Sequence, residues 1–117
     1  MAIHNQTGKD GEGLAVEWLV SKGYNLLHKN WRHGHWEVDI IASKEKRLHI
    51  IEVKTRTSKK FGHPEEGMGT KKMQYLINAA EEYMYQHPQW KQLQFDILAI
   101  TITLQEVEYF LIEDVYL

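Results

Sequence analysis

Two apolar stretches that carry charged residues constrain the fold of this chain more than any other feature of its sequence. The stretches 36–43 and 48–56 are rich in valine and isoleucine and have the length of β-strands. Glu37-Val38-Asp39 lies inside the first stretch, and Glu52-Val53-Lys54 lies inside the second. Charged side chains rarely enter apolar surroundings unless they are paired or hold a metal ion, so these residues need a chemical explanation.

The short connection between the two stretches predicts a hairpin that brings its charges together. If the turn centres on Glu45-Lys46, Asp39 lies opposite Glu52, and Glu37 lies opposite Lys54. All four charged side chains then share one face of the hairpin. A shift by one residue would mix charged with apolar side chains, so the pattern favours this register. The other face carries the apolar residues that we expect in the core, which are Val38, Ile40, Ile51 and Val53.

The rest of the sequence predicts a single α/β domain over residues 1–117. We expect Thr7 to cap a helix over 8–22 that ends at Gly23, and a second helix over 70–86 that ends at His87-Pro88. Further strands are expected at 24–29, 94–104 and 107–112, with a loop at 57–69. The resulting order α-β-β-β-α-β-β predicts a mixed β-sheet flanked by helices.

Composition excludes several classes of protein. The chain has 117 residues and no cysteine, which excludes disulfides, thiolate metal sites and cysteine nucleophiles. No apolar run has the length of a membrane span, and residues 1–7 lack the features of a signal peptide. We therefore expect a cytoplasmic protein with no membrane partner.

Basic residues gather around and after the charged hairpin. The segment 44–72 holds nine Lys or Arg and four Asp or Glu, whereas the rest of the chain holds five basic and twelve acidic residues. Such a local excess of positive charge indicates contact with nucleic acid, although solvated lysines are the simpler interpretation of Lys59-Lys60 taken alone. The candidate contacts are Arg56, Lys59, Lys60, Lys71 and Lys72.

The facing carboxylates predict a site for a divalent cation. Directly opposed residues have Cβ atoms about 4.5–5.5 Å apart, so Asp39 and Glu52 would repel each other. Magnesium or manganese would relieve this repulsion, because such ions bind one or two carboxylates together with waters and phosphate oxygens. Lys54 on the same face could position or deprotonate an attacking water, or neutralise the phosphate. These roles predict metal-assisted phosphodiester hydrolysis.

These residues also carry a resemblance to known families. Asp39 followed by Glu52-Val53-Lys54 resembles the PD-(D/E)XK signature of restriction-endonuclease-like and Holliday-junction-resolvase-like nucleases, with Val38 in place of the usual proline. More closely, and over nearly the whole chain, the sequence resembles the YraN-like family of uncharacterised proteins. The segments that carry this resemblance are Gly8–Glu12 with Ala15, Asn30-Trp31-Arg32, Trp36–Ile41, Glu52–Arg56, Lys71 and Phe95-Asp96-Ile97.

The resemblance implies a restriction-endonuclease-like fold with three layers and a nuclease-type site. It implies that Asp39 and Glu52 are metal ligands and that Lys54 is the catalytic lysine. It adds Glu12 of the first helix as a further acidic residue, and the Val53 carbonyl as a further ligand. The expected activity is a magnesium-dependent nuclease that acts on DNA rather than RNA, including branched or structured DNA.

Some of these residues have a second interpretation. Glu37 fits a salt bridge with Lys54 at least as well as a role as metal ligand, and Glu12 could be an ordinary acid in the first turn of a helix. His33 and His35 fall in a predicted loop and are better explained as exposed histidines than as metal ligands.

Trp31 and Trp36 could stack on nucleic-acid bases, but packing against the hairpin is the better explanation for both.

Two other functions are compatible with the sequence. The protein could be a catalytically silent nucleic-acid-binding module that uses the basic residues named above. It could also be an interaction protein that forms a homodimer through the apolar strand 107–112, if that strand lies at the edge of the sheet.

Overall fold

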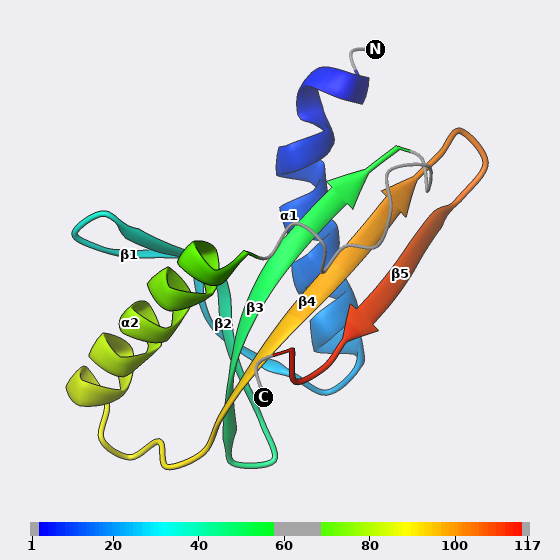
Figure 1. Cartoon of the computed structure of the whole chain (residues 1–117). Coiled ribbons are helices and arrows are strands. Elements are labelled where there is room, and N and C mark those ends of the chain that lie inside the picture. Colours follow the sequence, from blue (N-terminus) through cyan, green and yellow to red (C-terminus); the bar gives the residue numbers. More distant parts are fainter. Residues whose placement is uncertain (1–2, 58–68, 116–117) are drawn as a thin grey trace.

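Two helices and five strands build the fold in the order α-β-β-β-α-β-β (Figure 1). The computed structural model describes residues 3–57 and 69–115, and within these ranges the side chains from residue 11 onward. This order confirms the predicted α/β class. The elements are α1 (Ile3–Ser21), β1 (Asn25–His33), β2 (Trp36–Lys44), β3 (Arg47–Arg56), α2 (Thr70–Gln86), β4 (Leu93–Ile102) and β5 (Val107–Ile112).

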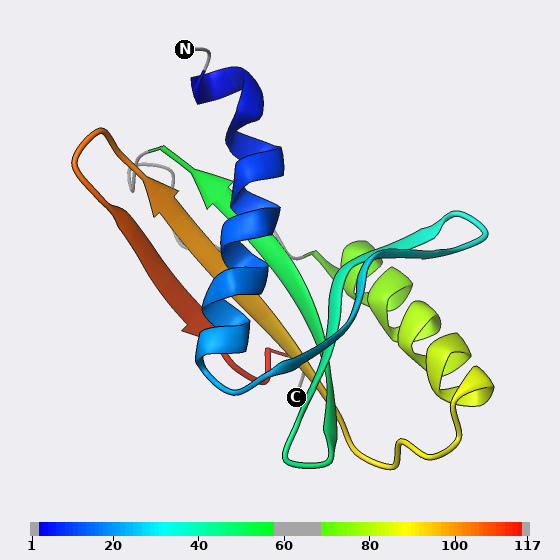
Figure 2. The ribbon, with the colours of Figure 1, turned by 180° about the vertical axis from the view of Figure 1, so that it is seen from behind.

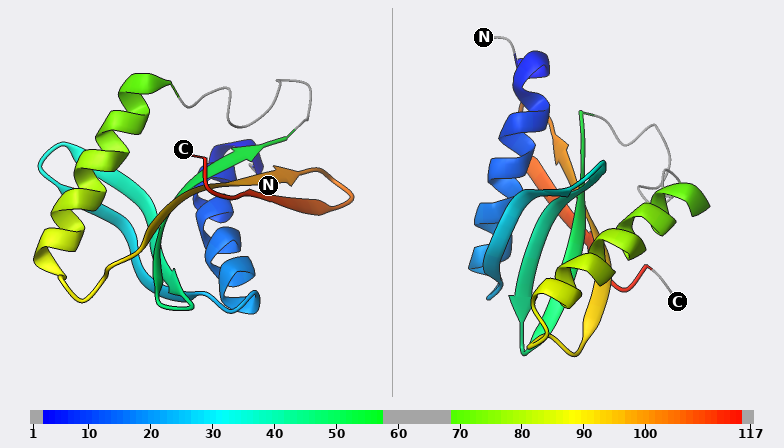
Figure 3. Two further views of the ribbon diagram at one scale, coloured as in Figure 1. Left: turned by 60° about the horizontal axis from the view of Figure 1, so that its bottom comes forward. Right: turned by 90° about the vertical axis from the view of Figure 1, so that its left-hand side faces the viewer.

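The strands form one mixed sheet in the order β1-β2-β3-β4-β5. Strands β3 and β4 run parallel, and every other neighbouring pair is antiparallel. Helix α2 lies in the crossover that a parallel pair requires. Helices α1 and α2 lie on opposite faces of the sheet, which is therefore the middle of three layers (Figures 2 and 3). The predicted three-layer architecture is confirmed.

The sheet has a separate apolar core on each face. Helix α1 covers one cluster, which contains Ala15, Leu19, Ile40, Ile51, Leu98 and Ile100, all at most 2% exposed. Helix α2 covers the other, which contains Val38, Ile41, Leu48, Ile50, Leu76 and Tyr83. No helix in residues 3–57 and 69–115 is long and apolar enough to cross a membrane.

The prediction that Val38 and Ile40 share one core is wrong. Val38 packs in the α2 cluster, whereas Ile40 packs in the α1 cluster. Strand β1 is distorted beside them, because Asn30 has a φ of 54°, in the left-handed region that strands normally avoid. The far end of the β1–β2 hairpin turns towards α2 (Figure 1).

The first helix differs from the prediction at its start and agrees with it at its end. Helix α1 begins at Ile3, so Thr7 lies inside the helix and does not cap it. Residues 3–7 contain no proline, so nothing in this segment prevents a helical conformation. At the other end Gly23 has a φ of 95°. The Gly23 N–H donates to the Val20 carbonyl at 3.1 Å, and the Tyr24 N–H donates to the Leu19 carbonyl at 3.0 Å, as in a Schellman motif.

The predicted β2–β3 turn is confirmed. Glu45 and Lys46 form a two-residue turn, with φ values of 51° and 66°, which is the pattern of a type I′ hairpin. Strand β1 is longer than expected and reaches His33, so that His33 ends a strand while His35 stays in the connection to β2.

Candidate functional site

Asp39 and Glu52 meet where strand β2 separates from strand β3. The ladder between the two strands follows the predicted register and ends at the pair Ile40 and Ile51. Beyond this pair, the Val53 N–H donates to Asp39 Oδ2 at 2.9 Å. In return, the Asp39 N–H donates to Glu52 Oε2 at 3.3 Å. The two side chains thus take the backbone hydrogen bonds that the diverging strands no longer make with each other.

A lysine from the second helix completes the surroundings of this pair. Lys72 Nζ lies 3.0 Å from Glu52 Oε1, and the Glu52 side chain is only 5% exposed whereas that of Lys72 is 42% exposed. Lys72 is one of the residues that we expect from the sequence to contact nucleic acid. In the structure its position in the first turn of α2 places its ammonium against the buried carboxylate of Glu52.

The electrostatics of the pair are dominated by burial and by the repulsion between the two carboxylates. Burial and then the charge of Glu52 raise the pKa of Asp39 to about 6, against the opposing effects of the Val53 N–H and of Lys72. Burial lowers the pKa of Lys72, but the hydrogen bond and charge of Glu52, together with the charges of Asp39 and Glu37, outweigh burial, so that the pKa is raised overall. The site therefore holds more negative charge than one lysine neutralises.

Glu12 lies near the pair but is bound elsewhere. Its Oε2 accepts a hydrogen bond from Asn30 Nδ2 at 3.1 Å, which joins α1 to the distorted part of β1. Its charge contributes the smallest of the effects that raise the pKa of Asp39. Within residues 11–57 and 69–115, no three histidine or acidic side chains are grouped closely enough to hold a metal ion as they stand.

The predicted pairing of Glu37 with Lys54 is wrong. Glu37 Oε2 lies 2.7 Å from the guanidinium of Arg32, its partner on β1. The prediction extended the β2–β3 ladder beyond Ile40, where β2 has already left β3 and keeps only β1 as its neighbour. Lys54 is half-buried on β3, and Val53 is half-buried against the α1 cluster.

The other described residues predicted to contact nucleic acid lie on different elements of the fold. Lys71 is exposed beside Lys72 on α2. The Arg56 Nε donates to Thr101 Oγ1 at 3.5 Å, which links β3 to β4. Lys59 and Lys60 lie outside the described residues.

The aromatic residues of the β1–β2 hairpin pack as expected. Trp31 and Trp36 are partly buried against the α2 cluster, and Trp31 meets Tyr83 edge-on with ring centroids 5.5 Å apart. His33 and His35 are exposed, as predicted; His33 Nε2 lies 3.9 Å from Glu82 Oε1, and the His35 ring lies against Tyr75.

A second polar cluster, on the α1 side of the sheet, was not predicted. Asp96 is 1% exposed, and its Oδ2 lies 2.7 Å from His49 Nδ1. Its Oδ1 accepts hydrogen bonds from Gln94 Nε2 at 2.8 Å and from the Asp114 N–H at 3.0 Å. The signal for this cluster was the occurrence of His49 and Asp96 inside apolar strand sequences. The Asp96 carboxylate, with both oxygens bonded, connects the chain after β5 to strands β3 and β4.

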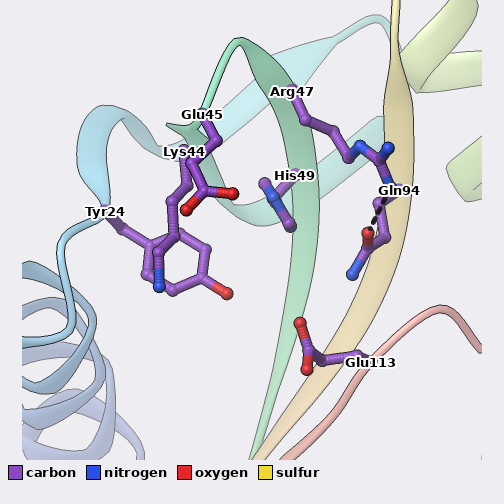
Figure 4. A pocket seen from close by; sticks show the side chains of 7 residues that line it. All are labelled: Tyr24, Lys44, Glu45, Arg47, His49, Gln94 and Glu113. Atoms are coloured by element: carbon purple, nitrogen blue, oxygen red, sulfur yellow. Dashed lines mark hydrogen bonds between the residues drawn. The ribbon is translucent and has the colours of Figure 1, made fainter.

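This cluster borders a hollow of about 290 Å³ beside the amino ends of β3 and β4 (Figure 4). The Tyr24 ring meets His49 edge-on, and the Lys44 ammonium lies 4.8 Å from the centre of the Tyr24 ring. Burial, followed by the charges of Asp96, Glu113 and Glu45, raises the pKa of Tyr24 to about 12. Basic and acidic side chains alternate around the opening, namely Lys44, Glu45, Arg47 and Glu113.

The three-layer fold, with paired carboxylates at the opening between β2 and β3, defines an α/β protein of nuclease-like architecture. The chain belongs to the family described as Uncharacterised protein family UPF0102, whose family model matches residues 11–100. This membership confirms the resemblance to the YraN-like family.

Similar proteins of the same family occur in several bacteria. A UPF0102 protein of Flavobacterium psychrophilum is 46% identical over 100 residues, which cover 86% of this chain and 84% of the relative. A UPF0102 protein of Bacteroides thetaiotaomicron is 44% identical over 100 residues, with 86% and 83% covered. The similarity therefore extends over most of both chains.

Proposed function

We propose that this protein is a magnesium- or manganese-dependent nuclease that hydrolyses phosphodiester bonds in DNA, including branched or structured DNA. The observation that carries the proposal is the pair of Asp39 and Glu52 at the place where β2 leaves β3. Hydrogen bonds with backbone N–H groups hold both carboxylates, so the pair is positioned before a ligand binds.

The charge of this pair fits a divalent cation. Repulsion from Glu52 raises the pKa of Asp39, so a cation that both carboxylates bind would relieve an unfavourable interaction. Carboxylate oxygens are the donors that magnesium and manganese prefer. Asp39 and Glu52 would hold the ion, with the Val53 carbonyl and Glu12 as further ligands. When bound, the ion would stabilise negative charge on the phosphate.

Lys54 is the residue that we assign to the attacking water or the phosphate. It follows Glu52 by two residues on β3, so both side chains leave the same face of the strand. An ammonium group at this place would position the water, accept its proton when deprotonated, or neutralise charge on the phosphate.

The test is cleavage of branched, flapped and single-stranded DNA by the purified protein in the presence of Mn²⁺ or Mg²⁺. We expect Asp39→Ala and Glu52→Ala each to lower the rate by at least about 100-fold. Glu37→Ala is the matched control, because Glu37 lies in the same strand but is bonded to Arg32. Cleavage that persists in both site variants would overturn the assigned site.

A catalytically silent nucleic-acid-binding module is the second candidate, and the ion pair between Lys72 and Glu52 favours it. Lys72 already neutralises part of the negative charge, so the repulsion within the site is reduced without a metal ion. This candidate predicts salt-sensitive DNA binding by the protein and no cleavage in any divalent cation.

A further inference from the structure

We propose that Lys72 acts as a built-in competitor for the metal ion: a divalent cation can bind both carboxylates only after Lys72 has left Glu52, and the displaced ammonium then contacts the substrate phosphate. This inference rests on the metal site of the proposed function and adds to it a residue of the second helix. It begins from the contacts that Glu52 makes in the structure.

Both carboxylate oxygens of Glu52 are already engaged. Oε2 accepts the Asp39 N–H at 3.3 Å, and Oε1 lies 3.0 Å from Lys72 Nζ. Asp39 Oδ2 accepts the Val53 N–H at 2.9 Å. A cation that binds Glu52 must therefore share an oxygen with one of these donors. The backbone donors belong to strands of the sheet, so the lysine is the partner that can give way.

An ammonium and a divalent cation exclude each other at one carboxylate oxygen. Magnesium binds oxygen at about 2.0–2.1 Å and accepts little distortion of its coordination. An ammonium that stayed at hydrogen-bonding distance from the same oxygen would place two positive charges within about 4 Å of each other, in a site from which water is partly excluded. The two cations therefore compete for Glu52.

The structure also decides which partner moves. The Glu52 side chain is 5% exposed and extends from the interior of β3, whereas the Lys72 side chain is 42% exposed at the first turn of α2. A flexible four-carbon stem allows the ammonium to move without a shift of the helix. After displacement, Lys72 would remain on the first turn of α2 beside the carboxylates, where its ammonium could contact a phosphate bound to the ion.

The experiment is calorimetric titration of the full chain with MgCl₂ and with MnCl₂. We expect Lys72→Met, which keeps most of the stem and removes the charge, to bind each ion about three- to fivefold more tightly than the wild type, a change within the range for losing one ionic contact. Lys71→Met is the matched control, because Lys71 is the exposed neighbour on the same turn, and its affinity should stay within about twofold of the wild type.

Two further variants separate competition from damage to the fold. Lys72→Arg keeps the positive charge and should retain the weaker binding of the wild type. Lys72→Gln keeps a hydrogen-bond donor for Glu52 and should bind the ions more tightly, even if Lys72→Met folds poorly. Thermal unfolding gives a second readout: added Mg²⁺ should raise the melting temperature of Lys72→Gln more than that of the wild type.

The outcomes distinguish the inference from the proposed function. Tighter binding by both uncharged variants supports it, including the case in which the wild type binds no ion. Equal or weaker binding by these variants, with measurable binding by the wild type, overturns the competition and leaves the nuclease proposal intact. If neither the wild type nor the uncharged variants bind Mg²⁺ or Mn²⁺, the metal site itself is overturned, and the inference falls with it.

Discussion

At the scale of single residues, Asp39 and Glu52 have two roles that oppose each other. They replace hydrogen bonds that the diverging strands have lost, and this stabilises the fold. They also place two negative charges together in a partly buried site, which destabilises it. Residues that lower the stability of the free protein in this way are frequent at ligand sites, because the ligand removes the repulsion.

The stability of the metal-free protein should depend on the ionisation of Asp39. The pKa of this carboxyl is raised from 3.8 to about 6 by burial and by Glu52. A carboxyl whose pKa is raised in the folded state contributes stability below its unfolded pKa, and this contribution is lost as the pH rises through 6. Asp39→Asn removes the charge and keeps an acceptor for the Val53 N–H. In EDTA at pH 7.5 we expect it to stabilise the protein by about 2–3 kcal/mol.

Urea unfolding at pH 7.5 and at pH 4 measures this effect. The gain in the free energy of unfolding for Asp39→Asn should disappear near pH 4, where the wild-type carboxyl is protonated in the folded state. Glu37→Gln serves as the control, since Glu37 is paired with Arg32 on the exposed side of the hairpin. The same gain at both pH values would contradict the role of ionisation.

At the scale of elements, the sequence predicted which segments are helices and strands better than it predicted their ends. The β2–β3 hairpin and its turn could be predicted because the alternation of apolar residues and a two-residue connection leave one register. The distortion at Asn30 was not predicted. Asparagine adopts the left-handed region more readily than most residues, but the bond from Asn30 to Glu12 of α1 joins segments that are distant in the sequence.

The approach of α1 to β3 gives a prediction at this scale. A Cβ atom at Gly11 would lie 2.1 Å from Thr55 Oγ1, whereas one at Gly13 would meet nothing within 4 Å. Gly11→Ala should therefore push the helix from the sheet and destabilise the protein by about 1–3 kcal/mol. Gly13→Ala is the matched control in the same helix, and should stabilise it by up to about 1 kcal/mol.

Urea unfolding of the two variants measures the difference. Gly11→Ala combined with Thr55→Ala should recover part of the loss, because the second change removes the oxygen that the new methyl group meets. Equal stability of Gly11→Ala and Gly13→Ala would show that α1 does not lie this close to β3.

At the scale of the whole molecule, α1 and α2 cover opposite faces of the sheet (Figure 3). Residues from both helices nevertheless affect the carboxylates at the place where β2 separates from β3. Lys72 of α2 and Glu12 of α1 both act on the pKa of Asp39, in opposite directions. The buried pair of His49 and Asp96 lies on the α1 side, towards the amino ends of β3 and β4. The two polar clusters therefore have separate surroundings.

The uneven distribution of charge along the chain predicts how binding to DNA should depend on its lysines. Lys59→Glu with Lys60→Glu should weaken the binding of double-stranded DNA and lower the slope of log affinity against log salt by about 2. The control is the pair Lys29→Glu and Lys91→Glu, two exposed lysines outside the basic segment. An equal effect of both pairs in fluorescence anisotropy would contradict a basic DNA-binding segment.

The sequence by itself determined the features that depend on neighbouring residues. Apolar alternation and the two-residue turn were sufficient to pair Ile40 with Ile51 and so to bring Asp39 next to Glu52, because register follows from side-chain period and turn length. The resemblance of the motifs was sufficient to identify the family.

Only the tertiary structure decided which charges are partners across the fold. Because the β2–β3 ladder ends at Ile40, Glu37 pairs with Arg32 of β1 and not with Lys54. The crossover through α2 places Lys72 beside Glu52 and places Asp96 of β4 beside His49 of β3. These contacts join residues on different strands and helices, and they depend on where strands separate and how helices dock. The spacing of apolar residues within one strand or helix carries no information about where strands separate or how helices dock.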